Sequence, residues 1–182
     1  MNDLSLFVLD IAENSVEANA RNIEIAVDEY FDRFVIVVKD DGCGMDEQEA
    51  NSALNTSYSS KGGNRGHGLP RLKAAAEKTG GFVKLASQRG KGTRLEAVFY
   101  KSNSPALGDI NKTIRLLIFC HPDIDFVFRR TRRGKELLLD STRIRAAADA
   151  PVNSPEVSEW IKGYLQQQTQ NIFGGAVDEI NG

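Results

Sequence analysis

Asp10 and Asn14 are the first residues whose types and spacing could do chemistry. They lie four positions apart in DIAENSVEANA, residues 10–20, so on a helix they would lie one turn apart on the same side. A carboxylate and an amide in that arrangement offer oxygens that a single ligand could share. The alternative is a solvated helix edge with only local hydrogen bonds, which accounts for most such pairs when they are taken alone.

A second group surrounds Asp40, which ends a strand-like run in VVKDDGCGMD, residues 37–46. Gly42 and Gly44 follow it. Because glycine has no Cβ and adopts positive φ, this turn could let a flat ligand approach the backbone. The Asp40 carboxylate could accept a hydrogen bond from an exocyclic amine of such a ligand, with Asp41 as a neighbouring polar residue. A simple strand-to-helix turn explains the same pattern.

The third group is KGGNRGHGLPRL, residues 61–72. Glycines just before a helix expose several backbone N–H groups, and the helix dipole adds partial positive charge there. Lys61 and Arg65 would add two mobile cations, so this segment could bind an anion. It matches neither the GxxxxGK[ST] phosphate-binding loop nor the GxGxxG dinucleotide motif. A flexible linker is the alternative.

The fourth group is RGKGT, residues 89–93, where Thr93 follows Gly90 and Gly92. A β-rich run lies on each side of it, so the tight turn of a hairpin is the simplest explanation. Taken alone, this group predicts no ligand.

A helix over residues 3–19 would carry the first group. Its apolar side chains recur every three to four residues, with one longer gap, at Leu4, Val8, Ile11 and Ala18. Asp10 and Asn14 fall on the neighbouring stripe, so we expect them at the edge of the buried face.

The other three groups fall at the ends of expected elements. The β-rich runs predict two hairpins, 23–27 with 34–40 and 82–88 with 93–100. Two further helices are expected, over 46–54 and from Pro70 onward. Helices that alternate with antiparallel strand pairs predict an α+β fold, with helices on one face of the sheet.

Residues 103–108 are polar and contain Pro and Gly, which predicts a linker between a domain at 1–102 and a small α+β extension at 109–182. A helix, a hairpin and a capped helix are expected in the extension, at 111–119, 125–140 and 154–168. Arginines cluster around the hairpin turn. A solvated turn is the simpler explanation for them, and an acidic protein partner is the alternative.

Composition excludes several classes of protein. The formal charge is −2 and the pI about 5.8, which gives no bulk reason to expect nucleic acid as a partner. No apolar run approaches the roughly 20 residues that span a bilayer, and the N-terminus does not resemble a signal peptide, so a cytoplasmic protein is expected. The two cysteines, Cys43 and Cys120, lie far apart without a CxxC motif. Neither a zinc site nor a disulfide framework is predicted.

Taken in order, the four groups closely resemble the GHKL ATPase superfamily, which includes DNA gyrase B, a heat-shock chaperone, sensor histidine kinases and mismatch-repair ATPases. The resemblance covers about residues 3–100. It implies a Bergerat-type two-layer sandwich with a mixed, mostly antiparallel sheet, and ATP as the ligand. The helix and hairpin after residue 109 are similar, over a short stretch, to those that open the second domain of mismatch-repair ATPases.

The resemblance implies roles for residues of the first helix. Asn14 matches the family's Mg²⁺ ligand, and an amide oxygen suits this hard cation. Asp10 matches the general base that activates water, where the ATP-hydrolysing branches carry a Glu. Asp10 keeps the carboxylate of that Glu, but its side chain is one methylene group shorter. Glu13 points about 100° away around the helix and is the poorer candidate for the base.

The resemblance also assigns the nucleotide contacts. Asp40 matches the acid that binds the adenine amino group, with Gly42 and Gly44 admitting the base, and Thr93 matches the hydroxyl that helps to fix the adenine end. The phosphates would be held by the glycine-rich segment, at Lys61, Arg65, Gly66, His67, Gly68 and Leu69. Residues 54–65 would form the mobile ATP lid.

The implied function is a Mg·ATP-binding regulatory protein that hydrolyses ATP or phosphorylates a partner, similar to the anti-sigma-factor kinases of this superfamily. No phosphoacceptor helix precedes the first helix, and neither His67 nor His121 lies in such a context. Self-phosphorylation on histidine is therefore not expected. The alternative is a non-catalytic module that senses the nucleotide. We expect a protein partner, leave a homodimer open, and expect neither a membrane nor nucleic acid.

Overall fold

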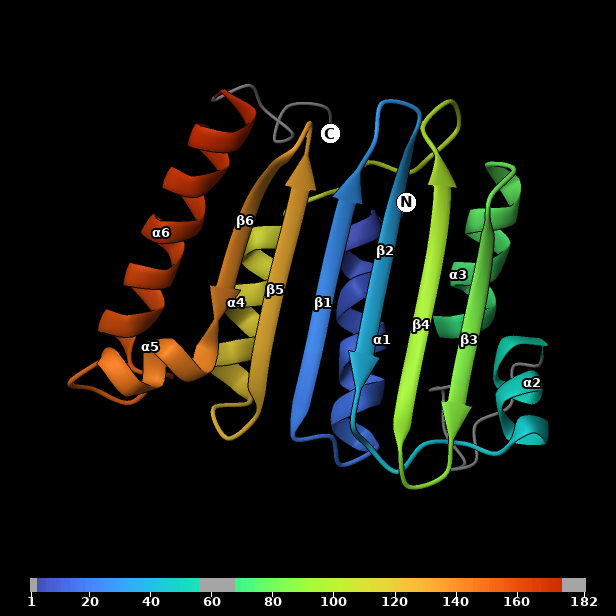
Figure 1. The fold of residues 1–182 in the computed structure, drawn as a ribbon, viewed down its shortest axis with the longest axis horizontal. Coiled ribbons are helices and arrows are strands. Elements are labelled where there is room, and N and C mark those ends of the chain that lie inside the picture. Colours follow the sequence, from blue (N-terminus) through green and yellow to red (C-terminus); the bar gives the residue numbers. More distant parts are fainter. Residues whose placement is uncertain (1–2, 56–67, 175–182) are drawn as a thin grey trace.

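The computed structural model describes residues 3–55 and 68–174. Within them, six strands form one sheet in the order β3-β4-β2-β1-β5-β6 (Figure 1). The strands are β1 (Asn22–Glu29), β2 (Arg33–Asp40), β3 (Phe82–Gln88), β4 (Gly92–Tyr100), β5 (Asp125–Arg132) and β6 (Lys135–Asp140). β1 and β5 are parallel, and the other neighbouring pairs are antiparallel. This confirms the α+β fold with a mixed, mostly antiparallel sheet.

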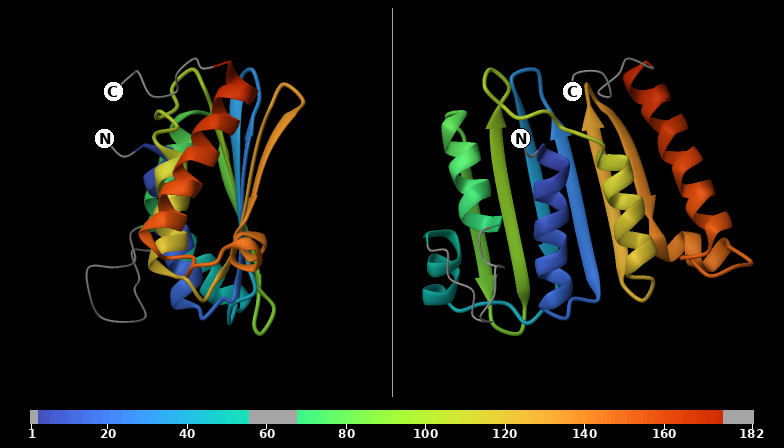
Figure 2. Two further views of the ribbon diagram at one scale, coloured as in Figure 1. Left: turned by 90° about the vertical axis from the view of Figure 1, so that its left-hand side faces the viewer. Right: turned by 180° about the vertical axis from the view of Figure 1, so that it is seen from behind.

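Helices cover one face of this sheet, where α1, α3 and α4 lie in one layer (Figure 2). Their bounds are α1 (Leu4–Glu17), α2 (Glu47–Asn55), α3 (Gly68–Lys78), α4 (Ile110–Cys120), α5 (Ser141–Ala147) and α6 (Pro155–Phe173). Strand residues that alternate in sequence point to the two faces in turn, and on β1 the buried set is Ile23, Ile25 and Val27. Those three side chains pack under the helices.

α1 crosses the middle of the sheet and carries the first group of polar residues. It begins after Asp3, whose side chain accepts a hydrogen bond from the Leu6 amide and caps the helix. Its buried residues are Leu4, Ser5, Phe7, Val8, Ile11, Ala12 and Ser15. The longer gap in the apolar stripe is therefore filled by a buried serine, Ser15.

The residues after 109 extend the same sheet and the same core. β5 pairs with β1 along its whole length, from Asn22 with Asp125 to Glu29 with Arg132. Phe126 and Phe128 of β5 belong to one cluster of buried apolar residues together with α1 and α4. The expected helix, hairpin and capped helix are all present, and α5 is an additional short helix. The division into two domains at 103–108 stays a prediction.

α6 is the longest helix of the described residues. Ser154 caps it, because its side chain accepts a hydrogen bond from the Val157 amide, and Pro155 occupies its first turn. The hydroxyl of Tyr164 donates to the Leu138 carbonyl of β6 at 2.8 Å, so α6 shields part of that sheet edge. In the described part of the chain, no helix combines the length and apolar character that crossing a membrane requires.

Candidate functional site

Of the expected site residues that the structure describes, Asp40 and Thr93 lie at one end of the sheet, where β2 ends and β4 begins at the lower side of Figure 1. Asp40 ends β2 and pairs in register with Thr93 at the start of β4. α1 lies beside this strand end, and α3 begins near the same place, since Gly68 adjoins Asp10. The end of β2, the start of β4, α1 and the start of α3 therefore lie close together.

Asp40 is held by hydrogen bonds from three directions. The Ser15 hydroxyl donates to Oδ2 at 2.7 Å, while the amides of Gly42 and Thr93 donate to Oδ1 at 2.9 and 3.2 Å. The side chain is half-buried. These donors fix the plane of the carboxylate. Oδ1 accepts two of the three hydrogen bonds, so Oδ2 retains the lone pair that could accept a hydrogen bond from a ligand amine.

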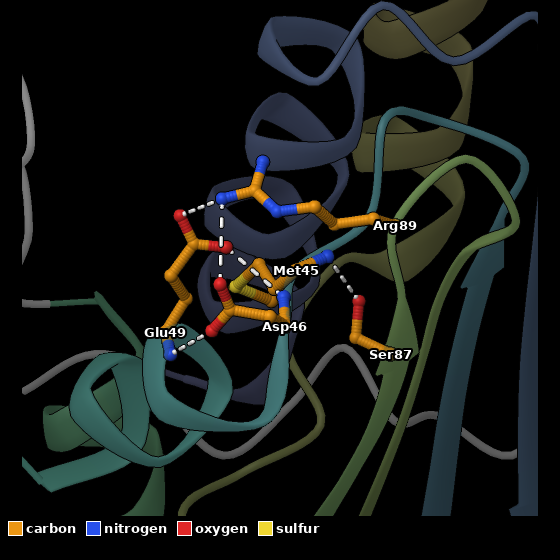
Figure 3. Close-up of polar contacts among 5 residues, drawn as sticks. All are labelled: Met45, Asp46, Glu49, Ser87 and Arg89. Carbon is orange, nitrogen blue, oxygen red and sulfur yellow. Dashed lines mark hydrogen bonds and ion pairs between the residues drawn. The ribbon is translucent and has the colours of Figure 1, made fainter.

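Thr93 belongs to a second small network with Ser87 of β3. The two hydroxyls lie 2.8 Å apart, and the Ser87 oxygen also accepts a 2.8 Å hydrogen bond from the amide of Met45. Figure 3 shows the Met45–Ser87 contact from the loop that follows Asp40. Ser87 therefore joins the DxGxG turn to the β3–β4 hairpin, next to the hydroxyl expected at the adenine end.

Gly42 and Gly44 are needed for packing as well as for any ligand. A Cβ at Gly42 would lie 2.8 Å from both Cβ and the carbonyl oxygen of Ala18, at the end of α1. Gly44 has φ +63, and a Cβ there would meet the backbone of Gln88. These close backbone approaches explain why the turn carries glycines.

Asp10 lies beside the start of α3. A Cβ built at Gly68 would be 3.7 Å from Asp10 Cβ and 3.8 Å from its Oδ2. Gly68 opens α3, and the first amides of a helix have no intrahelical acceptor, so an anion is favoured there. Partial desolvation raises the pKa of the Asp10 carboxyl above its usual value, and the positive charge of Arg71 opposes that shift.

Asn14 and Glu13 leave α1 in different directions. Asn14 is exposed one turn after Asp10. Glu13 instead contacts His121, the residue that caps the end of α4: its Oε1 lies at hydrogen-bond distance, 3.0 Å, from His121 Nε2. Glu13 thus connects α1 to the end of α4.

Several expected phosphate-binding residues, Lys61, Arg65, Gly66 and His67, lie outside the described residues, as does most of the expected lid. Gly68 and Leu69 are described, and they form the first turn of α3. Leu69 is half-buried and packs against the core. The helix begins two residues before the expected Pro70, so the last glycine of the loop belongs to the helix itself.

The residues described suit a Mg²⁺ ion that takes few protein ligands. Among them, no three His, Cys, Asp or Glu side chains come together as a metal site. Mg²⁺ keeps several waters and is commonly bound by one or two side chains plus substrate phosphates. The exposed amide oxygen of Asn14, one turn from the Asp10 carboxylate, fits that donor set.

A charged cluster attaches α2 to the β3–β4 hairpin (Figure 3). Asp46 and Glu49 cap the start of α2 reciprocally, since each side chain accepts from the other's amide, at 2.9 and 3.0 Å. Arg89 donates to Glu49 at 2.6 Å and to Asp46 at 3.4 Å. The Glu49 amide, helped by Arg89, holds the pKa of Asp46 below its usual value. The hairpin thus fixes the helix that leads towards residues 54–65.

Sequence reasoning missed four residues of this region: Ser15, Arg71, Ser87 and Arg89. Ser15 could have been found, because it occupies the gap in the apolar stripe of α1, and a polar residue at a buried position needs a partner. Ser87 lies on β3, where half-buried and exposed residues alternate. A serine in such a strand breaks no apolar pattern, so the sequence does not single it out as Ser15 is singled out. Arg71 and Arg89 act across segments far apart in sequence, and such contacts are not encoded in local patterns.

Comparison with known proteins agrees with this geometry. The family model described as "Histidine kinase-, DNA gyrase B-, and HSP90-like ATPase" matches residues 2–103. Two proteins of Bacillus subtilis (strain 168) are similar. One is a probable C4-dicarboxylate sensor kinase, 25% identical over 104 residues, which are 53% of this chain and 19% of that protein. The other is the sensor protein CitS, 38% identical over 58 residues, 32% of this chain and 11% of that protein.

A solved structure supports the fold independently of these relatives. The N-terminal domain of a DNA repair protein has a TM-score of 0.58 and 20% identity, covering 77% of this chain and 53% of that one. The chain spans about a fifth or less of the two curated relatives. Because the family model matches more than half of the chain, the protein belongs to the histidine kinase-, DNA gyrase B- and HSP90-like ATPases and carries an ATP-binding domain.

Proposed function

We propose that this protein is a Mg·ATP-dependent regulatory enzyme that transfers the γ-phosphoryl group to water or to a protein partner, with Asp10 as the general base. The observation that carries this proposal is the position of Asp10, whose Oδ2 lies within 4 Å of a Cβ built at Gly68. A phosphate held at the start of α3 would adjoin this carboxylate. The sensor names of two relatives support a regulatory role.

The proposed binding mode follows the hydrogen bonds described. Asp40 would accept a hydrogen bond from the adenine amino group, because Ser15 and two backbone amides already fix the orientation of its carboxylate. Thr93 and Ser87 would lie at the same end. The phosphates would extend along α1 towards Gly68, so that Asn14 could hold Mg²⁺, which would neutralise phosphate charge when bound.

Asp10 would then act on the nucleophile. It would take the proton from water, or from a hydroxyl of the partner, as the oxygen bonds to the γ-phosphorus and the bond from that phosphorus to the ADP oxygen breaks. ADP leaves with the electron pair of the broken bond. Partial desolvation raises the pKa of Asp10, which makes its carboxylate a stronger base than an aspartate with an unshifted pKa.

Labelled ATP and an Asp10→Asn variant test this proposal. Purified protein is incubated with γ-labelled ATP, alone and with a matched cell lysate, and label is counted in free phosphate and in protein. We expect Asp10→Asn to lower transfer by about 10²-fold or more, the usual contribution of a general base, with little change in ATP affinity. Asp10→Glu, which keeps the carboxylate, serves as the control.

A non-catalytic nucleotide sensor is the second candidate, and one observation favours it. Arg89 connects the hairpin at the expected adenine end to the start of α2, which leads towards the lid. Nucleotide binding could therefore change the position of α2 without chemistry. Transfer that is unchanged in Asp10→Asn would favour the sensor and contradict the enzyme.

A further inference from the structure

A cavity of about 240 Å³ lies at the end of the sheet opposite to Asp40. Glu29, Tyr30, Phe31, Lys101, Arg132 and Arg133 line it. These residues come from the β1–β2 turn, the segment after β4 and the β5–β6 turn, all at the upper side of Figure 1. Glu29 is six residues along β1 from Ile23, which pairs with Asp40. At about 3.3 Å per residue, the two sites are on the order of 20 Å apart.

Glu29 is the buried centre of this cavity, with only 5% of its side chain exposed. Its Oε1 lies 2.9 Å from Lys101 Nζ and 3.7 Å from Arg132 Nε. Its Oε2 lies 3.6 Å from Arg130 Nη2. One carboxylate on β1 is thus surrounded by three cations, two from β5 and one from the segment after β4. Glu29 therefore has a structural role: its buried carboxylate needs charged partners, and by pairing with them it joins these segments.

The same arrangement leaves positive charge at the cavity wall. Among the described residues that line the cavity, Lys101, Arg132 and Arg133 are the cations and Glu29 is the one carboxylate. The neighbouring acids are engaged elsewhere, as Asp28 pairs with Arg129 at 3.1 Å, and Asp32 pairs with Arg33 at 3.2 Å. The surplus of two cations in a partly enclosed space attracts an anion, because the interaction is less screened there than in open solvent.

Aromatic side chains border the charged part of the cavity. Phe31 is 97% exposed at the tip of the β1–β2 turn, and Tyr30 is half-exposed beside it. The ring of Phe173 lies 5.4 Å from the Arg132 guanidinium carbon and limits where this group can move. An organic group attached to the anion could therefore pack on Phe31, which otherwise leaves its whole ring in water.

We propose that this cavity is a second ligand site that binds a phosphate group, either free or carried on a small organic molecule. Two arginines and a lysine suit a multiply charged oxyanion, because guanidinium groups pair with phosphate through two parallel hydrogen bonds. The cavity is smaller than the 300–1,000 Å³ typical of whole-ligand pockets. It holds the phosphate and the first atoms attached to it, with any remaining part lying over Phe31. This site does not depend on the proposed ATP chemistry.

Titration of the isotope-labelled full chain with inorganic phosphate and with phenyl phosphate tests the site. Backbone amide NMR signals of Phe31, Arg133 and Gly134 report on the cavity, while those of Gly92 and Thr93 report separately on the ATP site. We expect both ligands to shift the cavity signals, and phenyl phosphate to bind several-fold more tightly through Phe31. Phe31→Ser removes that difference and leaves the affinity for inorganic phosphate unchanged.

Charge variants complete the test. An Arg132→Gln/Arg133→Gln variant is expected to bind phosphate at least tenfold more weakly. Arg133→Gln alone, at a turn position without a packing role, keeps the test informative if the double variant is unstable. Arg143→Gln, at an arginine of α5 whose side chain is 80% exposed, is the matched control and should bind as the unaltered protein does.

Three results would overturn the proposal. The first is that the cavity signals do not shift, or shift equally with sodium chloride at the same ionic strength. The second is that affinity is unchanged in both arginine variants. The third is that benzoate binds as tightly as phenyl phosphate, which would assign the cavity to carboxylates. Each result is measured by the NMR signals of the amides at the cavity, so none of them bears on the proposed ATP site.

Discussion

The Ser15 hydroxyl donates a 2.7 Å hydrogen bond to Oδ2 of Asp40 and joins α1 directly to the end of β2. Ser15 follows Asn14 in sequence, so the residue proposed to hold Mg²⁺ and the residue proposed to bind adenine are separated by one peptide bond and one hydrogen bond. The distance between the two ends of the nucleotide is therefore set by a short, rigid connection. This contact makes Ser15 a positioning residue for both.

Ser15→Ala is expected to weaken ATP binding by about fivefold, because a hydrogen bond of this kind contributes about 1 kcal/mol. Isothermal titration calorimetry of the purified protein measures the change. Ser5→Ala is the matched control, since Ser5 is also buried on α1 but bonds to Asp3, at the far end of the helix. Equal ATP affinity in both variants would contradict the positioning role of Ser15.

We expect Asp40→Asn to affect ATP binding and Asp41→Asn to affect the stability of the fold. Asp40→Asn replaces an acceptor oxygen with a donor and should lower ATP affinity by roughly tenfold or more. Asp41 accepts from the amides of Arg21 and Asn22 at 2.8 Å and from Asn22 Nδ2 at 2.7 Å. Asp41→Asn should therefore lower the melting temperature while ATP affinity stays within a factor of two or so. The reverse pattern would overturn the assignment of Asp40.

Asn14→Ala is expected to remove the effect of Mg²⁺ on nucleotide binding. The amide oxygen is the proposed ligand, and alanine offers none, so ATP affinity with Mg²⁺ should fall towards the affinity measured with a chelator. Calorimetry of both proteins, with and without Mg²⁺, gives the comparison. A variant that keeps the full Mg²⁺ dependence would show that the ion binds elsewhere.

The pKa of Asp10 predicts the pH dependence of activity. A general base must be ionised, and desolvation raises the pKa of this carboxyl despite the nearby charge of Arg71. Activity should therefore be lost, as pH falls, at a higher pH than for an aspartate with an unshifted pKa. Arg71→Gln removes the opposing charge and should move this acidic limb to still higher pH. A limb that stays fixed in Arg71→Gln would contradict the role of Asp10.

The same shift has a consequence for stability. Because the folded state raises the pKa of Asp10, the ionised carboxylate is less favourable in the folded chain than in the unfolded one, and stability decreases as pH rises through this range. At neutral pH, the Asp10→Asn variant should then melt at a slightly higher temperature than the unaltered protein. At a pH below the pKa that the Asp10 carboxyl has in the unfolded chain, this difference should disappear. Thermal melts at two pH values check the sign.

Sequence patterns predicted much of this architecture, because helices, strands and turns depend mainly on residues that are close together in the sequence. Alternating apolar residues identified β1 and β2, and the Asp40 turn followed from two glycines that the close backbone contacts require. The parallel pairing of β1 with β5 was not predicted, since the two strands are about a hundred residues apart and share no turn. Contacts such as Ser15 with Asp40 likewise depend on how elements pack, and Ser15 was missed although it fills the gap in the α1 stripe.

The parallel pairing also covers the side of β1 that faces away from β2. Without β5, the backbone N–H and C=O groups along one side of β1 would be unpaired, next to the buried row of Ile23, Ile25 and Val27. An open edge of that kind recruits strands from other molecules. The C-terminal hairpin therefore supplies, from the same chain, the strand that pairs with β1. A shortened ATP-binding half would have to find another strand to cover β1, and a second copy of itself would supply one.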